Sequence, residues 1–150
     1  MLKKAFLVLI LAAYTLFTSS CDDRPQWEID QELIEQYVSD HNINATKHES
    51  GLWYEIRKSG GSIHPNVNSK VNVDYVGTLL DGTEFDSGDN VDMILSKTIT
   101  GWQIGIPLIG EGGKILLIIP SNLGYGPHDQ GSVPANSVMV FEVTLNFVAK

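Results

Sequence analysis

The chain has 150 residues, of which 43% are hydrophobic, and its formal net charge of −8 reflects 18 acidic against 10 basic residues. This length accommodates one domain with a substantial core and short attachments. The acidic balance argues against nucleic-acid binding, because nucleic-acid-binding proteins need clustered Lys and Arg side chains. It also argues against electrostatic adsorption to anionic lipid.

The first twenty residues have the composition of a targeting segment. Lys3 and Lys4 precede an apolar and aromatic run at residues 5–17, and small residues follow at 18–20. The run is too short to span a bilayer as a permanent helix, which needs about 20 residues, but it suits the hydrophobic region of a signal peptide. We therefore predict a signal peptide at residues 1–20, whose removal would change the formal charge to −10.

Cys21 is the only cysteine, so no intramolecular disulfide is possible. Its position after the signal peptide resembles that of the lipidated cysteine of bacterial lipoproteins, although Thr18 stands where that motif usually has Leu. The acidic pair at 22–23 is similar to the residues that follow this cysteine in some surface-exported Bacteroidetes lipoproteins. The resemblance implies a bacterial cell-envelope protein, periplasmic or surface-facing, with a lipid anchor on Cys21. A free thiol after an ordinary secretory cleavage site is the alternative.

A helix of about three turns is expected at residues 28–40, after a short linker at 22–27. Apolar side chains recur there at helical spacing, at Ile29, Leu33, Ile34, Tyr37 and Val38. Asp30, Glu32 and Glu35 line the other face, and Asp30 is placed to support the helix start. The helix is interpreted as a cap packed on a sheet, with a partner-binding or spacer helix as the alternative.

From residue 51 the pattern becomes that of strands. Alternating segments occur at 51–58, 71–79 and 138–147, and residues 114–119 are apolar on both faces, as in a central strand that Pro120 stops. Asp81-Gly82 is a turn signal between strands. Short apolar pieces lie at 93–95 and 98–99, and a loop rich in Gly and Pro at 121–136. These segments predict an α+β fold, with an antiparallel sheet of five or six strands around one short helix.

The stretch Thr98-Ile99-Thr100-Gly101-Trp102 is interpreted as a strand end that turns into this short helix, because Gly lets the backbone turn without a Cβ clash. More aromatic residues occur at separated, strand-like positions, namely Tyr75, Phe85, Tyr125 and Phe141. Rings spaced in this way either converge on one concave apolar pocket or fill a small β core.

Six blocks in this region together resemble the FKBP-type peptidyl-prolyl cis-trans isomerases, in family order from about residue 50 to 148. The first joins V-D-Y-V-G at 73–77 to D-G-T-E-F-D-S at 81–87. The next are I-T-G-W at 99–102 and E-G-G-K at 111–114. The last three are I-P with L-G-Y-G at 119–126, V-P-A-N-S at 133–137 and V-F-E-V at 140–143.

The resemblance implies a twisted antiparallel half-barrel wrapped over one short helix, with the helix at 28–40 as an extra element. It divides the chain into the signal peptide at 1–20, a segment at 21–49 with the lipidated Cys21, linker and helix, and an isomerase domain at 50–150. The residues that match the family's catalytic positions are Tyr75, Phe85, Asp86, Ile99, Trp102, Tyr125 and Phe141. Those that match substrate-binding positions are Met93, Thr98 and Val133.

In this resemblance Trp102 would form the pocket floor, and Tyr125 and the Ile99 N–H would contact substrate carbonyl groups. Asp86 would either shape the field near the twisting carbonyl and orient neighbouring side chains, or cap its own turn. Met93 stands where the family often has Phe and Thr98 where it usually has Val, which implies a looser, slightly more polar pocket. Both differences make macrolide inhibitor binding doubtful.

The implied activity is isomerisation of X-Pro bonds in exported polypeptides, with proline-containing clients as partners. The reaction makes and breaks no covalent bond, so no cofactor and no metal are expected. Two other classes remain open, a non-catalytic chaperone or proline-segment binding module, and a subunit of an envelope complex that docks through the helix at 28–40.

Overall fold

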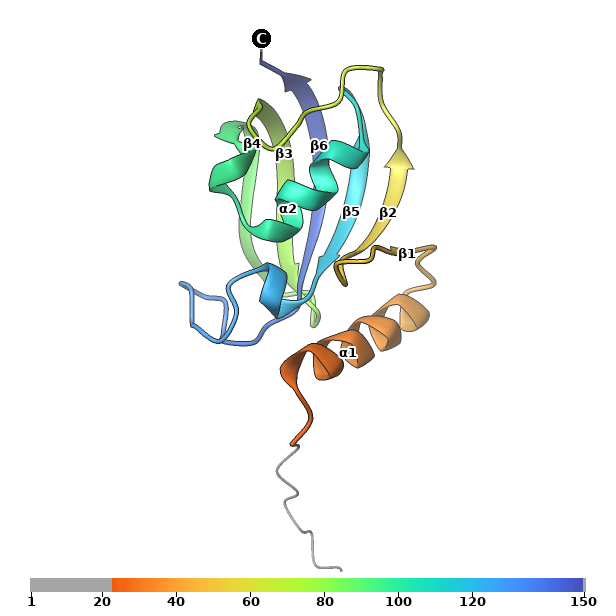
Figure 1. The fold of residues 1–150 in the computed structure, drawn as a ribbon, viewed down its shortest axis with the longest axis vertical. Helices are drawn as coiled ribbons and strands as arrows, with labels where there is room; N and C mark the ends of the chain where they lie inside the picture. Colours follow the sequence, from red (N-terminus) through yellow and green to blue (C-terminus); the bar gives the residue numbers. More distant parts are fainter. Residues whose placement is uncertain (1–22, 150) are drawn as a thin grey trace, which may run out of the picture.

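A six-stranded antiparallel sheet forms the body of the computed structural model, which describes residues 23–149 (Figure 1). The strand order is β1-β2-β5-β6-β3-β4. The strands are β1 (Thr46–Lys47), β2 (Trp53–Lys58), β3 (Lys70–Leu79), β4 (Glu84–Ile94), β5 (Lys114–Ile119) and β6 (Met139–Val148). The α+β class and the antiparallel sheet over a short helix are therefore confirmed.

The short helix α2 (Thr100–Gly105) crosses one face of the sheet (Figure 1). Trp102 and Ile106 are buried there against side chains of β5 and β6. The helix lies close to β5 because two of its residues have no Cβ. A Cβ on Gly101 would lie 2.6 Å from Cγ2 of Ile119, and one on Gly105 would lie 2.4 Å from Cδ2 of Leu117.

The other face of the sheet is covered at one end by α1 (Gln26–Asp40), which lies near the end of β5 (Figure 1). Ile34 of α1 is fully buried in a second cluster with Leu116, Ile118, Val138 and Val140. Alternate residues of β5 thus enter opposite clusters, which explains why this strand is apolar on both faces. The helix at 28–40 is a cap packed on the sheet, as interpreted from the sequence.

The structure corrects three details of this helix. It begins at Gln26 rather than at residue 28, with Pro25 as the preceding cap residue. Asp30, expected on the outer face, is completely buried, whereas Leu33, expected on the apolar face, is 44% exposed. The buried positions are Asp30 and Ile34, four residues apart on one side of the helix, and Leu33 lies outside that stripe.

The hairpin between β3 and β4 forms at Asp81-Gly82, as the turn signal predicts. Gly82 adopts a positive φ of 85°, which glycine tolerates without strain. The Thr83 N–H donates to the Asp81 carboxylate over 2.8 Å, and the Leu79 N–H donates to the Thr83 carbonyl over 2.9 Å.

Two segments differ from the sequence interpretation. The polar break at 42–50 contains the short strand β1, which pairs with β2. The chain before α2 is not a strand end, because β4 ends at Ile94 and a 3-10 turn at residues 95–97 follows. Val71, Val73 and Tyr75 do share one face of β3, as predicted from their alternation.

Between residues 23 and 149, no helix combines the length and the apolar character needed to cross a membrane. The predicted signal peptide at 1–20 and the predicted lipidation site Cys21 lie outside the described residues.

The contact of α2 with β5 predicts a specific sensitivity. Gly101→Ala places a methyl group against Ile119 in a packed core, and we expect it to lower the free energy of unfolding by about 1–3 kcal/mol. Urea unfolding measures this change. Gly61→Ala is the matched control, because its Cβ would meet its nearest neighbour, the Glu111 carbonyl oxygen, at an ordinary 3.6 Å. Equal stability of the two variants would contradict this account of α2 packing.

Candidate active site

An aromatic cavity of about 230 Å³ opens beside α2. Its lining comes from β3, β4, the segment between β4 and α2, α2 itself, the loop after β5, and β6. The lining residues are Tyr75, Asp86, Met93, Lys97, Thr98, Ile99, Trp102, Tyr125 and Phe141. Segments far apart in the sequence therefore contribute to one concave surface.

Trp102 lies at the centre of the aromatic cluster and is only 4% exposed. Its ring meets Tyr75 at a centroid distance of 5.2 Å and Phe141 at 5.3 Å, with interplanar angles of 85° and 87°. These are edge-to-face contacts, the geometry that aromatic quadrupoles favour, and each contributes about 0.5–1.5 kcal/mol beyond its buried area. The cluster holds the indole in a fixed place at the base of the cavity.

Phe85 supports this cluster from outside the cavity lining. Its ring meets Phe141 edge-to-face at 5.4 Å. Both rings pack over Gly77, where an added Cβ would lie 2.7 Å from Phe141 and 2.8 Å from Phe85. Gly77 therefore allows both rings to pack close to β3. The sequence motif V-D-Y-V-G contains this residue, but no role was predicted for it.

Asp86 and Tyr75 are joined by a hydrogen bond, in which the Tyr75 hydroxyl donates to the Asp86 carboxylate over 2.9 Å. Burial, the hydrogen bond to Asp86 and the negative charge of Asp86 together raise the pKa of Tyr75 to about 12, and burial has the largest effect. Of the two roles left open for Asp86, this contact supports the one in which it orients a neighbouring side chain.

Tyr125 is the exposed aromatic residue of the lining, at 36% exposure, and stands at the rim of the cavity. Its pKa is raised, first by burial and then by the charge of Asp86. The hydroxyl is protonated at neutral pH, as an ordinary tyrosine is, and can donate a hydrogen bond.

The segment before α2 presents an unused backbone donor. The Ile99 N–H donates to no acceptor in the part of the chain that the structure describes, whereas the Ile99 carbonyl accepts from the N–H of Trp102 over 3.0 Å. The Thr98 hydroxyl donates to the Leu95 carbonyl over 2.7 Å, which reduces the polarity that Thr98 adds to the cavity.

The buried indole N–H of Trp102 also has no acceptor among residues 23–149. Leaving a buried donor unsatisfied costs about 1–3 kcal/mol, so this group is a candidate to interact with water or a bound ligand. The indole N–H and the Ile99 N–H are thus both donors at the site that the described chain leaves without partners.

Most of the predicted site residues meet at the cavity, and two do not line it. Phe85 lies behind Phe141, and Val133, which is 3% exposed, belongs to the core. Val133 exchanges two backbone hydrogen bonds with Gln130, which fold the loop back on itself. Lys97 lines the cavity but was not predicted as a site residue, because its local sequence has no motif or periodicity that indicates a binding role.

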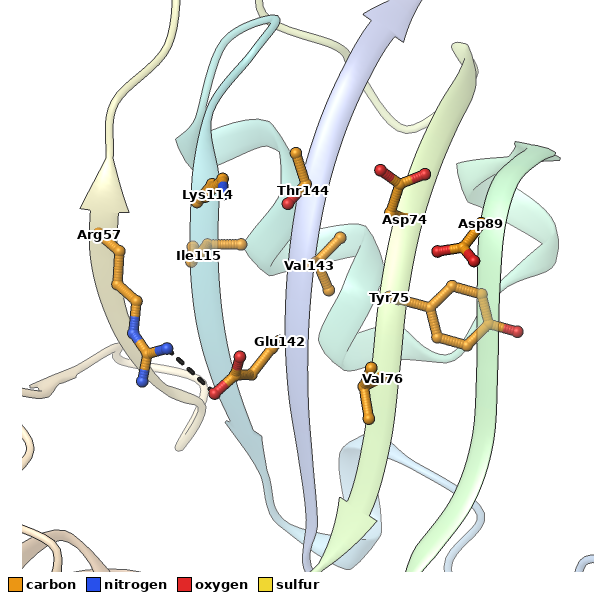
Figure 2. A pocket seen from close by; sticks show the side chains of 10 residues that line it. All are labelled: Arg57, Asp74, Tyr75, Val76, Asp89, Lys114, Ile115, Glu142, Val143 and Thr144. Carbon is orange, nitrogen blue, oxygen red and sulfur yellow. Dashed lines mark hydrogen bonds and ion pairs between the residues drawn. The ribbon is translucent and has the colours of Figure 1, made fainter.

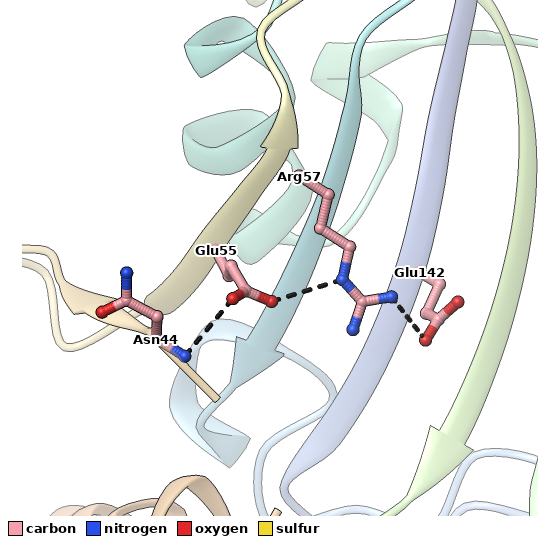
Figure 3. Close-up of polar contacts among 4 residues, drawn as sticks. All are labelled: Asn44, Glu55, Arg57 and Glu142. Carbon is pink, nitrogen blue, oxygen red and sulfur yellow. Dashed lines mark hydrogen bonds and ion pairs between the residues drawn. The ribbon is translucent and has the colours of Figure 1, made fainter. Parts of the chain in front are cut away.

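A larger hollow, of about 420 Å³, lies on the face of the sheet opposite α2 (Figure 2). Charged side chains of both signs surround it, including Arg57, Lys114, Asp74 and Glu142. Arg57 reaches across β5 to Glu142 over 3.0 Å and also contacts Glu55 over 3.3 Å (Figure 3). Arg57 and Glu142 are exposed there, and Tyr75 is the one aromatic residue in the lining, so this hollow lacks the aromatic cluster of the cavity beside α2.

The described residues contain no group of three or more His, Cys, Asp or Glu side chains arranged to hold a metal ion.

The contact of Tyr75 with Asp86 predicts a change in titration. Asp86→Ala removes the acceptor and its charge but leaves the burial, so the pKa of Tyr75 falls from about 12 part of the way to its ordinary value near 10. Because the folded-state pKa is raised, the stability linked to this group is complete below about pH 10 and is lost as the pH rises toward 12. Tyrosine ζ-carbon NMR measures the titration. Ser87→Ala, a neighbouring change that leaves the contact intact, is the control, and an unchanged pKa in Asp86→Ala would contradict the assignment.

The model of the family described as FKBP-type peptidyl-prolyl cis-trans isomerase matches residues 61–146. The FKBP-type peptidyl-prolyl cis-trans isomerase FkpA of Aeromonas hydrophila is 43% identical over 106 residues, which are 68% of this chain and 40% of that protein. FkpA of Escherichia coli K12 is 35% identical over 119 residues, which are 77% of this chain and 43% of that protein. The chain thus spans about two fifths of the length of these curated relatives.

Solved structures lead to the same family. The crystal structure of Escherichia coli FkpA matches with a TM-score of 0.72 and 33% identity, covering 82% of this chain and 62% of that one. A peptidyl-prolyl cis-trans isomerase from Pseudomonas syringae matches with a TM-score of 0.71 and 26% identity, covering 85% of this chain and 98% of that one. The matched residues include every part of the aromatic cavity, and this chain belongs to the family of FKBP-type peptidyl-prolyl cis-trans isomerases.

Proposed function

We propose that this protein catalyses cis-trans isomerisation of X-Pro bonds in the cavity beside α2. The observation that carries the proposal is the convergence of Tyr75, Trp102 and Phe141 on one cavity inside the region that matches the isomerase family. A proline ring is apolar and flat enough to lie on the indole of Trp102 between the other two rings.

Rotation about an X-Pro bond is slow because the amide must lose its resonance, a barrier of about 18–20 kcal/mol. Water favours the planar, charge-separated amide, and an aromatic cavity does not. Transfer into the cavity therefore destabilises the planar ground state relative to the twisted transition state, which is catalysis by differential binding. No bond to a nucleophile is needed at any step.

Hydrogen-bond donors at the cavity hold the substrate while the bond turns. The Tyr125 hydroxyl at the rim and the unpaired Ile99 N–H are suited to bind carbonyl groups on either side of the proline. Fixing both flanking carbonyls lets the bond between them rotate without release of the peptide. Asp86 holds the Tyr75 ring in place and sets a negative potential beside the rotating carbonyl.

The cavity size favours a short peptide as the ligand. Its volume of about 230 Å³ lies below the range of about 300–1,000 Å³ that is usual for drug-sized molecules. Proline-bearing segments of exported polypeptides are the proposed substrates, and tight macrolide binding is not expected. Lys97 at the cavity wall favours an acidic or polar residue near the proline over a basic one.

We also propose that the protein works in a bacterial cell envelope, anchored by acyl chains on Cys21. The support is the signal-peptide pattern of residues 1–20, which ends at this lone cysteine. Helix α1 begins at Gln26, so the linker between the proposed anchor and the folded body would be short. Such a tether would keep the cavity near the membrane from which exported chains emerge.

The anchor predicts fatty-acid labelling. In cells that express the full chain with a radiolabelled fatty acid, the wild type and a Ser19→Ala control carry the label and sediment with membranes. Cys21→Ser carries none, because the acceptor sulfur is absent. A cleaved wild-type chain without label would indicate ordinary secretion with a free thiol instead.

The activity is tested with exchange NMR on a short X-Pro peptide. We expect the wild type to accelerate isomerisation and Tyr125→Ala to lower kcat/KM about tenfold, the effect of losing one hydrogen bond and a ring contact. Phe147→Ala is the matched control, since Phe147 is an exposed aromatic on β6 that does not line the cavity.

Two other outcomes identify the remaining function classes. A folded wild type that binds proline peptides without accelerating their exchange would refute the enzyme and indicate a proline-segment binding module. A folded wild type that neither binds nor isomerises any X-Pro peptide would leave the envelope-complex subunit.

A further inference from the structure

Asp30 of α1 is a fully buried carboxylate that the proposed reaction does not use. Three donors surround it. The Ser121 N–H and the Ser121 hydroxyl donate to its Oδ2 atom over 2.8 and 2.6 Å, and the Gln26 side-chain amide donates to Oδ1 over 2.8 Å. Burial of a carboxylate is tolerated only with such partners, so this is a built contact between α1 and the chain after β5.

Ser121 continues the connection toward the cavity. Its carbonyl oxygen accepts from the N–H groups of Gly124 and Gly126, over 3.0 and 2.9 Å. These two glycines flank Tyr125, the donor at the rim of the cavity. A continuous set of hydrogen bonds thus runs from the helix outside the matched family region to both sides of one site residue.

We propose that Asp30 is a positioning residue for Tyr125, acting through Ser121. The proposal rests on the proposed isomerase function for its effect on turnover. Glycines on both sides of Tyr125 would otherwise give this loop large backbone freedom, and ordering it on substrate binding would cost conformational entropy. With Ser121 held by Asp30, the loop is ordered before the substrate arrives.

The first test compares variants of α1 in the isomerase assay. Asp30→Ala leaves both Ser121 donors without an acceptor, and we expect kcat/KM to fall about fivefold. Asp30→Asn keeps an acceptor oxygen for Ser121 and should restore most of this loss. Ile34→Ala is the matched control, because it removes a buried α1 side chain and destabilises the helix while leaving the contacts of Asp30 to Ser121 intact.

A double-mutant cycle separates positioning from general destabilisation. In a Tyr125→Ala background, Asp30→Ala should change kcat/KM less than about twofold, because the group that it positions is gone. A fivefold loss in both backgrounds, or an equal loss in Ile34→Ala, would overturn the proposal, since the effect would then not pass through Tyr125. An unchanged kcat/KM in a folded Asp30→Ala protein would overturn it as well.

A second readout does not depend on activity. Asp30→Ala should speed amide hydrogen exchange at Gly124 and Gly126 at least about tenfold, with exchange in β3 and β6 unchanged.

If Asp30→Ala does not fold, Ser121→Ala takes its place. This variant removes only the hydroxyl donor and should show the same changes at smaller size. If the wild type shows no isomerase activity, the proposed function fails, and the exchange at these two glycines alone decides the proposal. If Gly124 and Gly126 exchange in Asp30→Ala at the same rates as in the wild type, the proposal is overturned.

Discussion

The approach of α2 to β5 is the packing constraint on which the candidate site depends. Gly101 and Gly105 let the helix lie against Ile119 and Leu117, where any larger residue would push it away from the sheet. Trp102, held between these glycines, is thereby pressed into the concave face and meets Tyr75 and Phe141 edge-to-face. A helix of six residues could not fix an indole by its own stability, since isolated helices of this length do not form in water. The sheet supplies the rigidity of the cavity floor.

The same strand that supports the cavity also receives the amino-terminal helix. Alternate residues of β5 belong to the hydrophobic cluster that contains Trp102 of α2 and to the one that contains Ile34 of α1. The two helices therefore pack on opposite faces of the same strand. The chain that leaves β5 then passes Asp30 and reaches Tyr125. This connectivity explains how a helix on the far face of the sheet can influence a loop at the cavity rim.

The candidate site combines neutral hydroxyl and N–H donors with two charged lining residues, Asp86 and Lys97. Burial and the Asp86 carboxylate raise the pKa of both Tyr75 and Tyr125 above the ordinary value, at which tyrosine is already protonated at neutral pH. The hollow on the opposite face of the sheet is lined by charged side chains of both signs, and Arg57 forms ion pairs there with Glu55 and Glu142. The aromatic cavity destabilises a planar amide relative to a twisted one, and the charged hollow does not.

The sequence alone determined the α+β class, the Asp-Gly hairpin, the central strand at 114–119 and the set of aromatic residues, because alternation, turn chemistry and motif spacing are local properties of the chain. It also indicated the family, through blocks that the comparisons then matched. Only the tertiary structure decided that Asp30 is buried and Leu33 exposed, since the sequence does not show which side of a weakly amphipathic helix meets the sheet. The structure likewise placed Val133 in the core, moved Phe85 behind Phe141 and brought Lys97 to the cavity. Those positions depend on loop conformation and on contacts between residues distant in the chain, which no local pattern encodes.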